Sequence, residues 1–362
     1  MRRWIGLGLA AALAVAVGAA ILVSVAQRIH PPTPLTVVRG VIGSEKLPFF
    51  HDPAVIQAFK DNGYDVQVDT AGSRQIATTV DLSKYDFAFP AGVPAAEKIR
   101  LDRKARTTYS PFYTPMAIAT FKPIAQLLET AGIAKDNGSY ISFSVKAFLQ
   151  AVKDHKRWSN IQPNTVYSST KSILITSTDV RTSNSAAMYL SIGSYVANQD
   201  NIVQDSSQVK VVLPAVEPLF LEQGLTATSS EEPFQDYLSI GIGKTPMVMI
   251  YEAQFLAEAA AKNGSITKDM VLMYPDPDVL SKHTVVPLTT NGDKVGQLLL
   301  NNSQLQKLAT KYGFRTSNQT AFNQFLSAHG LTSPSLVDLI EPPTFQNLEA
   351  MIVAIQQQMQ GG

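Results

Sequence analysis

Segments that favour strands alternate with segments that favour helices, and this order constrains the fold of the chain more than any other feature. Leu35–Ile42 is apolar and β-branched, and a glycine turn and a helix that begins after Asp52-Pro53 follow it. The same order recurs at Tyr64–Thr70, where polar and apolar residues alternate, and at Tyr85–Phe89. Strands alternating with helices predict a parallel sheet covered on both faces. The sequence therefore predicts an α/β fold.

A second α/β unit follows the first. Tyr109–Thr120 contains two prolines, and we expect it to be an extended connector that leaves the first unit. In the second unit we expect strands at Ile173–Ser177 and Met247–Tyr251 and a helix at Asn184–Ala197. Asn198–Pro233 is polar and rich in turn residues, and its pattern assigns it to neither class.

The C-terminal part is expected to return to the first unit. Met270–Tyr274 and Thr284–Leu288 have the composition of strands, and helices follow them. The last helix, Phe345–Met359, carries apolar residues on one face, which indicates packing against a lobe. We therefore expect a first lobe that begins in 35–112, a second lobe in 113–268, and a return to the first lobe with C-terminal helices in 269–362.

The first 26 residues predict export of the rest of the chain. Trp4–Ala26 is apolar and uncharged and follows Arg2-Arg3. A helix over this run would be roughly 35 Å long, enough to cross a bilayer, and the arginines would hold its N-terminus in the cytoplasm. Segment 1–26 is either a retained single-pass anchor or a signal peptide cleaved after Ala26. Segment 27–34 is a proline-rich spacer, so the protein is expected in the cell envelope, outside the cytoplasmic membrane, or secreted or periplasmic after cleavage.

Composition and motifs exclude several function classes. The chain has no cysteine, which excludes disulfides, thiolate metal sites and a lipid-modified cysteine. Its net charge of +1, from 30 basic and 29 acidic residues, argues against nucleic acid as a partner. It has neither a Gly-x-Ser-x-Gly elbow nor a phosphate-binding Gly-x-x-x-x-Gly-Lys loop. The five histidines lack the spacing of metal ligands. We therefore expect no enzyme, no metal and no cofactor.

Small polar residues stand at the positions where α/β sheets bind ligands. In open α/β sheets, ligands lie beyond the carboxyl ends of strands, where helix N-termini point. Hydroxyl, amide and guanidinium groups are donors that suit a polar or anionic solute. An N-cap is the structural alternative for each serine or asparagine. The candidate ligand-binding residues are Ser44, Ser73, Arg74, Ser183, Asn184, Ser185 and Tyr251.

Two neighbours of Ser44 complicate a simple anion site. Glu45 would oppose a bound anion unless Lys46 or Arg74 neutralised its charge. A surface position or an ion pair within the lobe is the structural alternative for Arg74, and a half-buried position at a strand end is the alternative for Tyr251.

The order of these parts resembles the bacterial extracellular solute-binding proteins of the type 2 periplasmic fold, the superfamily that includes molybdate- and sulfate-binding proteins. The resemblance covers roughly residues 35–329. It rests on GSEKLPFFHDPAV (Gly43–Val55), AGSRQIAT (Ala71–Thr78), TDVRTSNSAAMYL (Thr178–Leu190), TPMVMIYEAQFL (Thr245–Leu256), MYPDPDV (Met273–Val279) and KYGFR (Lys311–Arg315). It implies two lobes that close over a ligand. The small residues of the first two loops, a loop of the second lobe and a late tyrosine would surround that ligand.

These observations together predict a protein that captures a small polar or anionic solute, an oxyanion for example, and presents it to a membrane transporter or another membrane partner. One alternative is an exported adaptor whose lobes bind another protein. A secreted α/β hydrolase is the alternative from another class, and the lack of a nucleophile–histidine arrangement in the sequence disfavours it.

Overall fold

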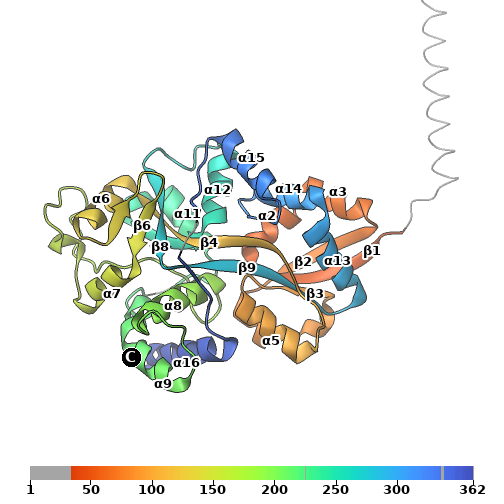
Figure 1. The fold of residues 1–362 in the computed structure, drawn as a ribbon, viewed down its shortest axis with the longest axis horizontal. Helices are drawn as coiled ribbons and strands as arrows, with labels where there is room; N and C mark the ends of the chain where they lie inside the picture. Colours follow the sequence, from red (N-terminus) through yellow and green to blue (C-terminus); the bar gives the residue numbers. More distant parts are fainter. Residues whose placement is uncertain (1–33, 225, 336–337, 362) are drawn as a thin grey trace, which may run out of the picture.

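The computed structural model describes residues 34–224, 226–335 and 338–361. Its strands are β1 (Thr36–Ile42), β2 (Tyr64–Thr70), β3 (Phe87–Phe89), β4 (Tyr109–Phe121), β5 (Ala134–Asp136), β6 (Ile141–Ser144), β7 (Met247–Tyr251), β8 (Met270–Asp276), β9 (Asp278–Pro287) and β10 (Leu339–Ile340). We use the name lobe 1 for the part around β1, β2 and β3, and lobe 2 for the part around β5, β6, β7 and β8. Figure 1 shows the two parts joined by β4 and β9.

Helices follow most strands, as the alternation in the sequence predicts. Their bounds are α2 (Leu47–Phe50), α3 (Pro53–Asp61), α4 (Ser73–Thr78), α5 (Val93–Arg103), α6 (Lys122–Thr130), α7 (Val145–Lys153), α8 (Asn184–Ala197), α9 (Ser206–Val216), α10 (Pro218–Leu221), α11 (Glu231–Ser239), α12 (Glu252–Ala261), α13 (Thr290–Asn301), α14 (Ser303–Lys311), α15 (Gln319–His329) and α16 (Phe345–Gly361). The mixed α/β architecture predicted from the sequence is confirmed.

The sheet of lobe 1 is parallel at its start. β1 pairs in parallel with β2 and with β3, so the loops that follow these three strands meet at one edge. β9 then pairs antiparallel with β3, through Ala88 and Val286 for example. The order across the whole sheet is β2-β1-β3-β9-β4-β8-β6-β5, with β7 beside β4 and β10 beside β9.

β4 and β9 form the connection between the lobes. The N-terminal half of β4 pairs antiparallel with β9, with Phe112 opposite His283 and Pro115 opposite Leu280. Beyond Pro115, β4 lies instead between β7 and β8 in lobe 2. The segment Tyr109–Thr120, expected as an extended connector, is therefore a strand that belongs to both lobes.

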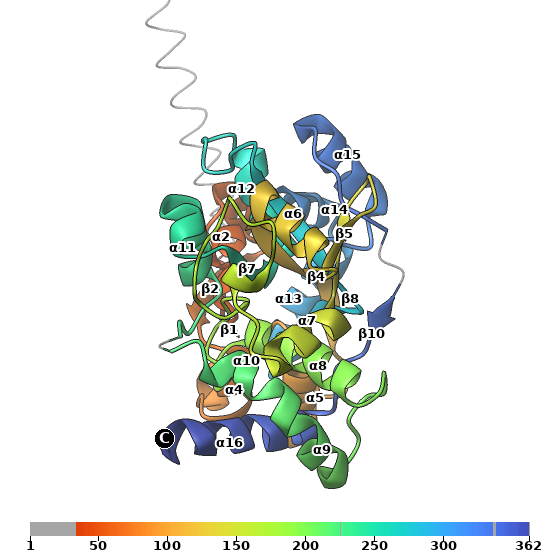
Figure 2. The same cartoon turned by 90° about the vertical axis from the view of Figure 1, so that its left-hand side faces the viewer.

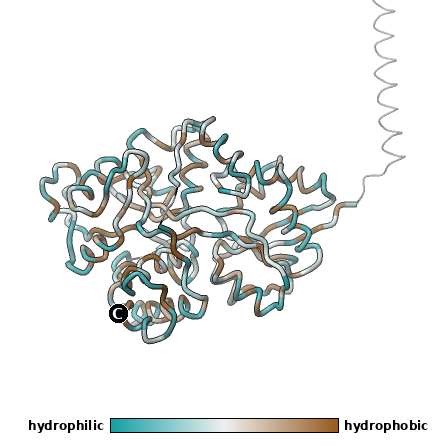
Figure 3. The backbone as a smooth tube through the Cα atoms, in the orientation of Figure 1, coloured by the Kyte–Doolittle hydropathy of each residue, from teal (hydrophilic) through white to brown (hydrophobic). Residues whose placement is uncertain are grey.

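Each lobe is held by helices whose apolar face covers the sheet. In α3, for example, Val55, Ala58 and Phe59 are buried while the opposite face is exposed. Figure 3 shows hydrophobic and hydrophilic residues alternating along such helices. β3 is buried along its whole length, because helices cover both of its faces.

One expectation for lobe 2 is wrong, and one segment without an assignment is helical. Ile173–Ser177 does not form a strand of the sheet, since only Thr176 bonds to β7, through Met247 and Met249. One bridging residue cannot make a ladder, although Ile173 and Ile175 are buried as in a strand. The segment Asn198–Pro233, which has no assignment from its pattern, contains α9 and α10, and Pro214 inside α9 obscures its helical pattern.

The C-terminal helix α16 lies beside both lobes. It contacts α8, α9, α10 and α5, and Figure 2 shows it running below α5, α8 and α10 with α9 beside it. Its apolar face is buried at Leu348, Met351, Ile352 and Ile355, which confirms the packing role predicted for that stripe.

The predicted N-terminal anchor or signal helix, 1–26, lies outside the described residues, and so does the spacer 27–34 except for Pro34. None of the helices formed by the described residues combines the length and the apolar character needed to span a bilayer.

Candidate functional site

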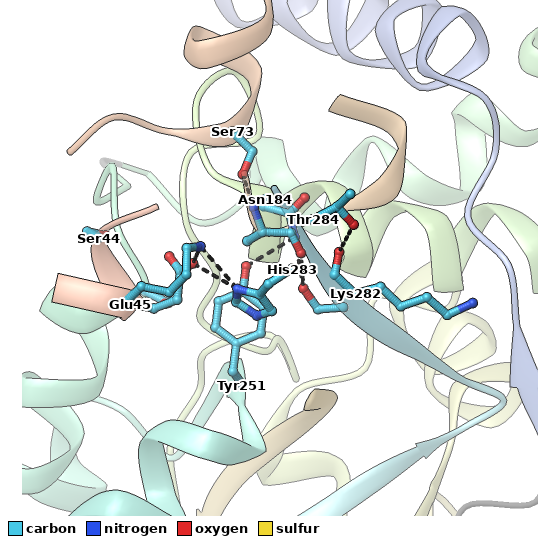
Figure 4. Close-up of polar contacts among 12 residues, drawn as sticks. Ser44, Glu45, Ser73, Asn184, Tyr251, Lys282, His283 and Thr284 are labelled. Atoms are coloured by element: carbon cyan, nitrogen blue, oxygen red, sulfur yellow. Dashed lines mark hydrogen bonds and ion pairs between the residues drawn. The ribbon is translucent and has the colours of Figure 1, made fainter. Parts of the chain in front are cut away.

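A pocket of about 280 Å³ lies where the loops after β1 and β2 meet the start of α8 and the end of β7. We call it the serine pocket, because small hydroxyl residues dominate its wall. Its lining residues are Gly43, Ser44, Glu45, Thr70, Ala71, Gly72, Ser73, Gln75, Ser183, Asn184, Thr228, Ser229, Ser230 and Tyr251. Figure 4 shows side chains from several of these elements gathered around one point.

The first loop brings Ser44 to the pocket and against lobe 2. β1 ends at Ile42, and Ser44 begins a single turn of 3-10 helix. The Oγ atoms of Ser44 and Ser229 lie 2.9 Å apart, which is a hydrogen bond between the first loop of lobe 1 and the segment before α11. The two lobes are therefore in contact across the serine pocket.

The second loop places Gly72 and Ser73 close to lobe 2. A Cβ on Gly72 would lie 2.2 Å from the carbonyl oxygen of Thr182, so only glycine fits this approach. Ser73 is buried, and its Oγ accepts a hydrogen bond of 2.9 Å from the backbone N–H of Ala91. Ser73 therefore lines the pocket and also fixes the loop that follows β3.

The start of α8 supplies the wall from lobe 2. Ser183 precedes the helix and makes no side-chain cap, and its Oγ lies 3.0 Å from that of Ser185. Asn184 donates from Nδ2 to the hydroxyl of Tyr251 at 3.1 Å and to Oγ of Ser281 at 3.3 Å. Ser185 is fully buried, pairs with Thr178 at 2.8 Å, and lies behind the pocket wall.

Tyr251 closes the base of the pocket at the end of β7. Its ring is buried, and burial together with the charge of Glu45 raises the pKa of its hydroxyl well above the ordinary value. The hydroxyl is therefore neutral at pH 7 and accepts a hydrogen bond from Asn184.

Three ionisable side chains meet beside the pocket: Glu45, Lys46 and His283. The ammonium of Lys46 contacts Oε1 of Glu45 and lies 3.1 Å from Nδ1 of His283. The same Nδ1 lies 3.3 Å from Oε1 of Glu45. Lys46 and His283 are fully buried, and Lys46 also faces the ring of Phe89 at 4.8 Å.

The pKa values of this cluster follow from burial and from its internal charges. Burial raises the pKa of Glu45, but the charge of Lys46 and the hydrogen bond from His283 lower it further, to below its ordinary value. Burial and the Lys46 charge lower the pKa of His283 to about 4. Burial lowers the pKa of Lys46, and the charge of Glu45 opposes that shift. The cluster is thus an ion pair of Glu45 and Lys46 beside an imidazole that is neutral at pH 7.

Arg74 points away from the serine pocket. Its Nε and Nη2 donate to the two carboxylate oxygens of Glu349, and its Nη1 donates to the carbonyl oxygen of Arg181 at 3.0 Å. The guanidinium is therefore engaged in an ion pair with α16, which is the structural alternative considered for it.

The structure thus brings together five of the seven residues singled out in the sequence. Ser44, Ser73, Ser183, Asn184 and Tyr251 line one pocket, whereas Arg74 and Ser185 do not.

Sequence reasoning missed the lobe 2 segment Thr228–Ser230 and the place of His283 beside Glu45. A run of small hydroxyl residues in 226–230 was a signal for the first. No local pattern marks the second, because 238 positions separate Glu45 from His283.

One other cavity has a different character. It is larger, about 620 Å³, and lies within lobe 2, between segments 157–177 and 222–246, and an ion pair of 2.7 Å between Lys244 and Asp236 stands in its wall. Since it lies within one lobe, movement of the lobes would not close it. Among the described residues, no three histidine, aspartate or glutamate side chains are placed to hold a metal ion.

Comparison by sequence finds no matching family model and no matching curated relative. Comparison of structures finds the sulfate-binding protein SubI of Mycobacterium tuberculosis, with a TM-score of 0.55 and 16% identity, over 89% of this chain and 99% of that one. It also finds the periplasmic binding protein AfuA of Actinobacillus pleuropneumoniae with bound fructose-6-phosphate. The TM-score is 0.54 and the identity 12%, over 90% of this chain and 96% of that one. Iron-bound HitA of Pseudomonas aeruginosa matches with a TM-score of 0.51 and 10% identity, over 90% of this chain and 99% of that one.

These similarities extend over nearly the whole of each structure and are those of one fold. The chain has the type 2 periplasmic-binding-protein fold, which confirms the resemblance inferred from its sequence.

Proposed function

We propose that this protein is an extracytoplasmic solute-binding protein that holds a small polar solute in the serine pocket and presents it to a membrane partner. The observation that carries the proposal is the composition of the pocket wall. Lobe 1 supplies Ser44 and Ser73, lobe 2 supplies Ser183 and Asn184, and Tyr251 closes the base. Hydroxyl and amide groups from two bodies can surround a polar solute and replace its water shell.

The connection between the lobes supports a closing motion. β4 and β9 are the paired strands that pass from one lobe to the other. Bending of a few residues at such a crossing opens or closes a cleft around a ligand. The hydrogen bond between Ser44 and Ser229 and the close approach of Gly72 to Thr182 belong to the closed arrangement.

The location and partner follow from the N-terminal segment and from the fold. The apolar run Trp4–Ala26 after two arginines would send the rest of the chain across the cytoplasmic membrane, and it would stay as an anchor or be removed after Ala26. Structural neighbours named as sulfate-binding and periplasmic binding proteins support a role in solute capture. A membrane transporter is the partner that such a role would need. The role proposed is binding, and no catalytic step is assigned to the pocket.

The experiment that tests this function is native mass spectrometry of the protein purified without refolding. We expect a mass increment from a bound small molecule, which is lost on mild activation. The matched control is the Gly72→Ala variant, in which the added Cβ prevents the lobes from closing. An unliganded wild-type protein whose melting temperature is also unchanged by any small polar solute would contradict the proposal.

A further inference from the structure

The serine pocket has one ionised group in its wall. Among its described lining residues, Glu45 is the only acidic or basic side chain, and the others carry hydroxyl, amide or small apolar groups. The basic groups nearest to Glu45 lie behind it, since Lys46 and His283 are fully buried and do not line the pocket. A solute in the pocket therefore meets a carboxylate and no cation.

The two oxygens of this carboxylate have different surroundings. The contacts from Lys46 and from His283 both fall on Oε1. Within the described part of the chain, Oε2 receives no hydrogen bond from any donor. Gly43 leaves room for this arrangement, because a Cβ there would lie 2.6 Å from Oε2. An ionised oxygen in a pocket wall needs a donor, and a bound solute can supply it.

We propose that the solute is a neutral molecule with several hydroxyl groups, a sugar or polyol, and that one of its hydroxyls donates to Oε2 of Glu45. This inference rests on the proposed solute-binding function and names its substrate class. A fully ionised oxyanion has no proton to donate to Oε2 and would set one acceptor oxygen against another. A cation would gain little, because Lys46 already neutralises Glu45.

The rest of the wall suits such a solute. Serine and threonine hydroxyls both donate and accept, and so does a hydroxyl of the solute. The volume of about 280 Å³ equals the share of roughly nine water molecules in the liquid. That space exceeds the need of a tetrahedral oxyanion with five heavy atoms and fits a ring or chain that carries several hydroxyls.

The test is a binding panel on the full chain at pH 7. The probes are neutral monosaccharides and polyols (glucose, galactose, mannose, ribose, glycerol, myo-inositol), oxyanions that carry no proton at pH 7 (sulfate, molybdate) and amines (ethanolamine, glycine), each measured by calorimetric titration. We expect at least one neutral sugar or polyol to bind and the oxyanions to bind at least tenfold more weakly. Tighter binding of an oxyanion or an amine overturns the substrate class but leaves the solute-binding function standing. If no neutral probe binds, the proposed substrate class is also overturned. If no probe of the panel binds, the result counts against both the substrate class and the solute-binding function.

The role of Glu45 is tested with the sugar or polyol that binds. Glu45→Gln keeps the size of the side chain and removes the charge, and we expect it to weaken binding ten- to hundredfold. Glu97→Gln makes the same chemical change on the exposed face of α5 and should bind as the wild type does. Because Glu45→Gln leaves Lys46 without its buried partner, the double variant Glu45→Gln, Lys46→Met is measured as well. Wild-type affinity in a folded variant of either kind overturns the assignment of Glu45.

Discussion

Arg74 of α4 and Glu349 of α16 form a two-pronged ion pair, with Nε 2.7 Å from Oε2 and Nη2 2.5 Å from Oε1. The same helix α16 donates from Nδ2 of Asn347 to the carbonyl oxygen of Val203, next to α9. The C-terminal helix is therefore bonded both to the second loop of lobe 1 and to lobe 2. Arg74 is placed to hold these parts together at one side of the serine pocket.

The first prediction concerns this ion pair. Arg74→Ala and Glu349→Ala should each lower the free energy of unfolding by about 1 kcal/mol. Partial exposure to water weakens the ion pair, but its two parallel hydrogen bonds strengthen it. The double variant should cost little more than either single one, since both remove the same interaction. Urea unfolding measures the three values. A loss of solute affinity above tenfold in Arg74→Ala but not in Glu349→Ala would instead place the guanidinium on the solute.

The second prediction uses Gly72 as a test of lobe closure. Its φ of −64° suits any residue, so Gly72→Ala should fold with a melting temperature near that of the wild type. The added Cβ would meet the backbone of Thr182, so the lobes should stay apart. Small-angle scattering should give a larger radius of gyration than for the wild type. The control is Gly243→Ala, where a Cβ meets no atom within 4 Å. A radius of gyration for Gly72→Ala equal to that of the wild type would show that the added Cβ does not keep the lobes apart.

The third prediction concerns the hydrogen bond between the lobes. Ser44→Ala and Ser229→Ala each remove one partner of the 2.9 Å contact. Each should weaken solute binding by about 0.5–1.5 kcal/mol, the usual worth of a neutral hydrogen bond. Calorimetric titration with the bound solute measures this loss. Ser239→Ala changes an exposed serine at the end of α11 and serves as the control, and additive losses in the double variant would mean that the two serines act separately.

The fourth prediction is a dependence of stability on pH that comes from His283. Its pKa is about 4 in the folded chain against 6.5 as the ordinary value, so the unfolded chain binds more protons between these values. The stabilisation is complete above pH 6.5 and is lost as the pH falls, by up to about 1.4 kcal/mol per unit and about 3 kcal/mol in total. Glu45, whose pKa is also lowered, adds a second loss as the pH falls through 4.5.

Free energies of unfolding in urea from pH 4.5 to 7.5 test this dependence. His283→Gln should reduce the slope below pH 6.5 by about one proton. His51→Gln, which changes an exposed histidine, is the matched control. An unchanged slope in His283→Gln would show that this imidazole does not titrate on unfolding.

Local structure followed from local pattern. The predicted strands Tyr64–Thr70 and Met247–Tyr251 and the helix Asn184–Ala197 have the same bounds in the structure. Alternation, helical periodicity and turn residues act within a few positions, so they can be seen in the chain itself. The same holds for the small polar loops, because residues after parallel strands meet at one edge of the sheet.

Tertiary structure alone decided which side chains those loops met. Arg74 lies directly after two pocket residues, yet its guanidinium is taken by Glu349, a partner 275 positions away. His283 reaches Glu45 only because β9 returns beside β3 and β4. The sequence by itself determined the α/β elements and the polar loops, since these depend on neighbours along the chain. Charge pairing, and with it the ionisation of Glu45, depended on the order of the strands in the sheet and on burial. Neither can be read from a local segment of the sequence.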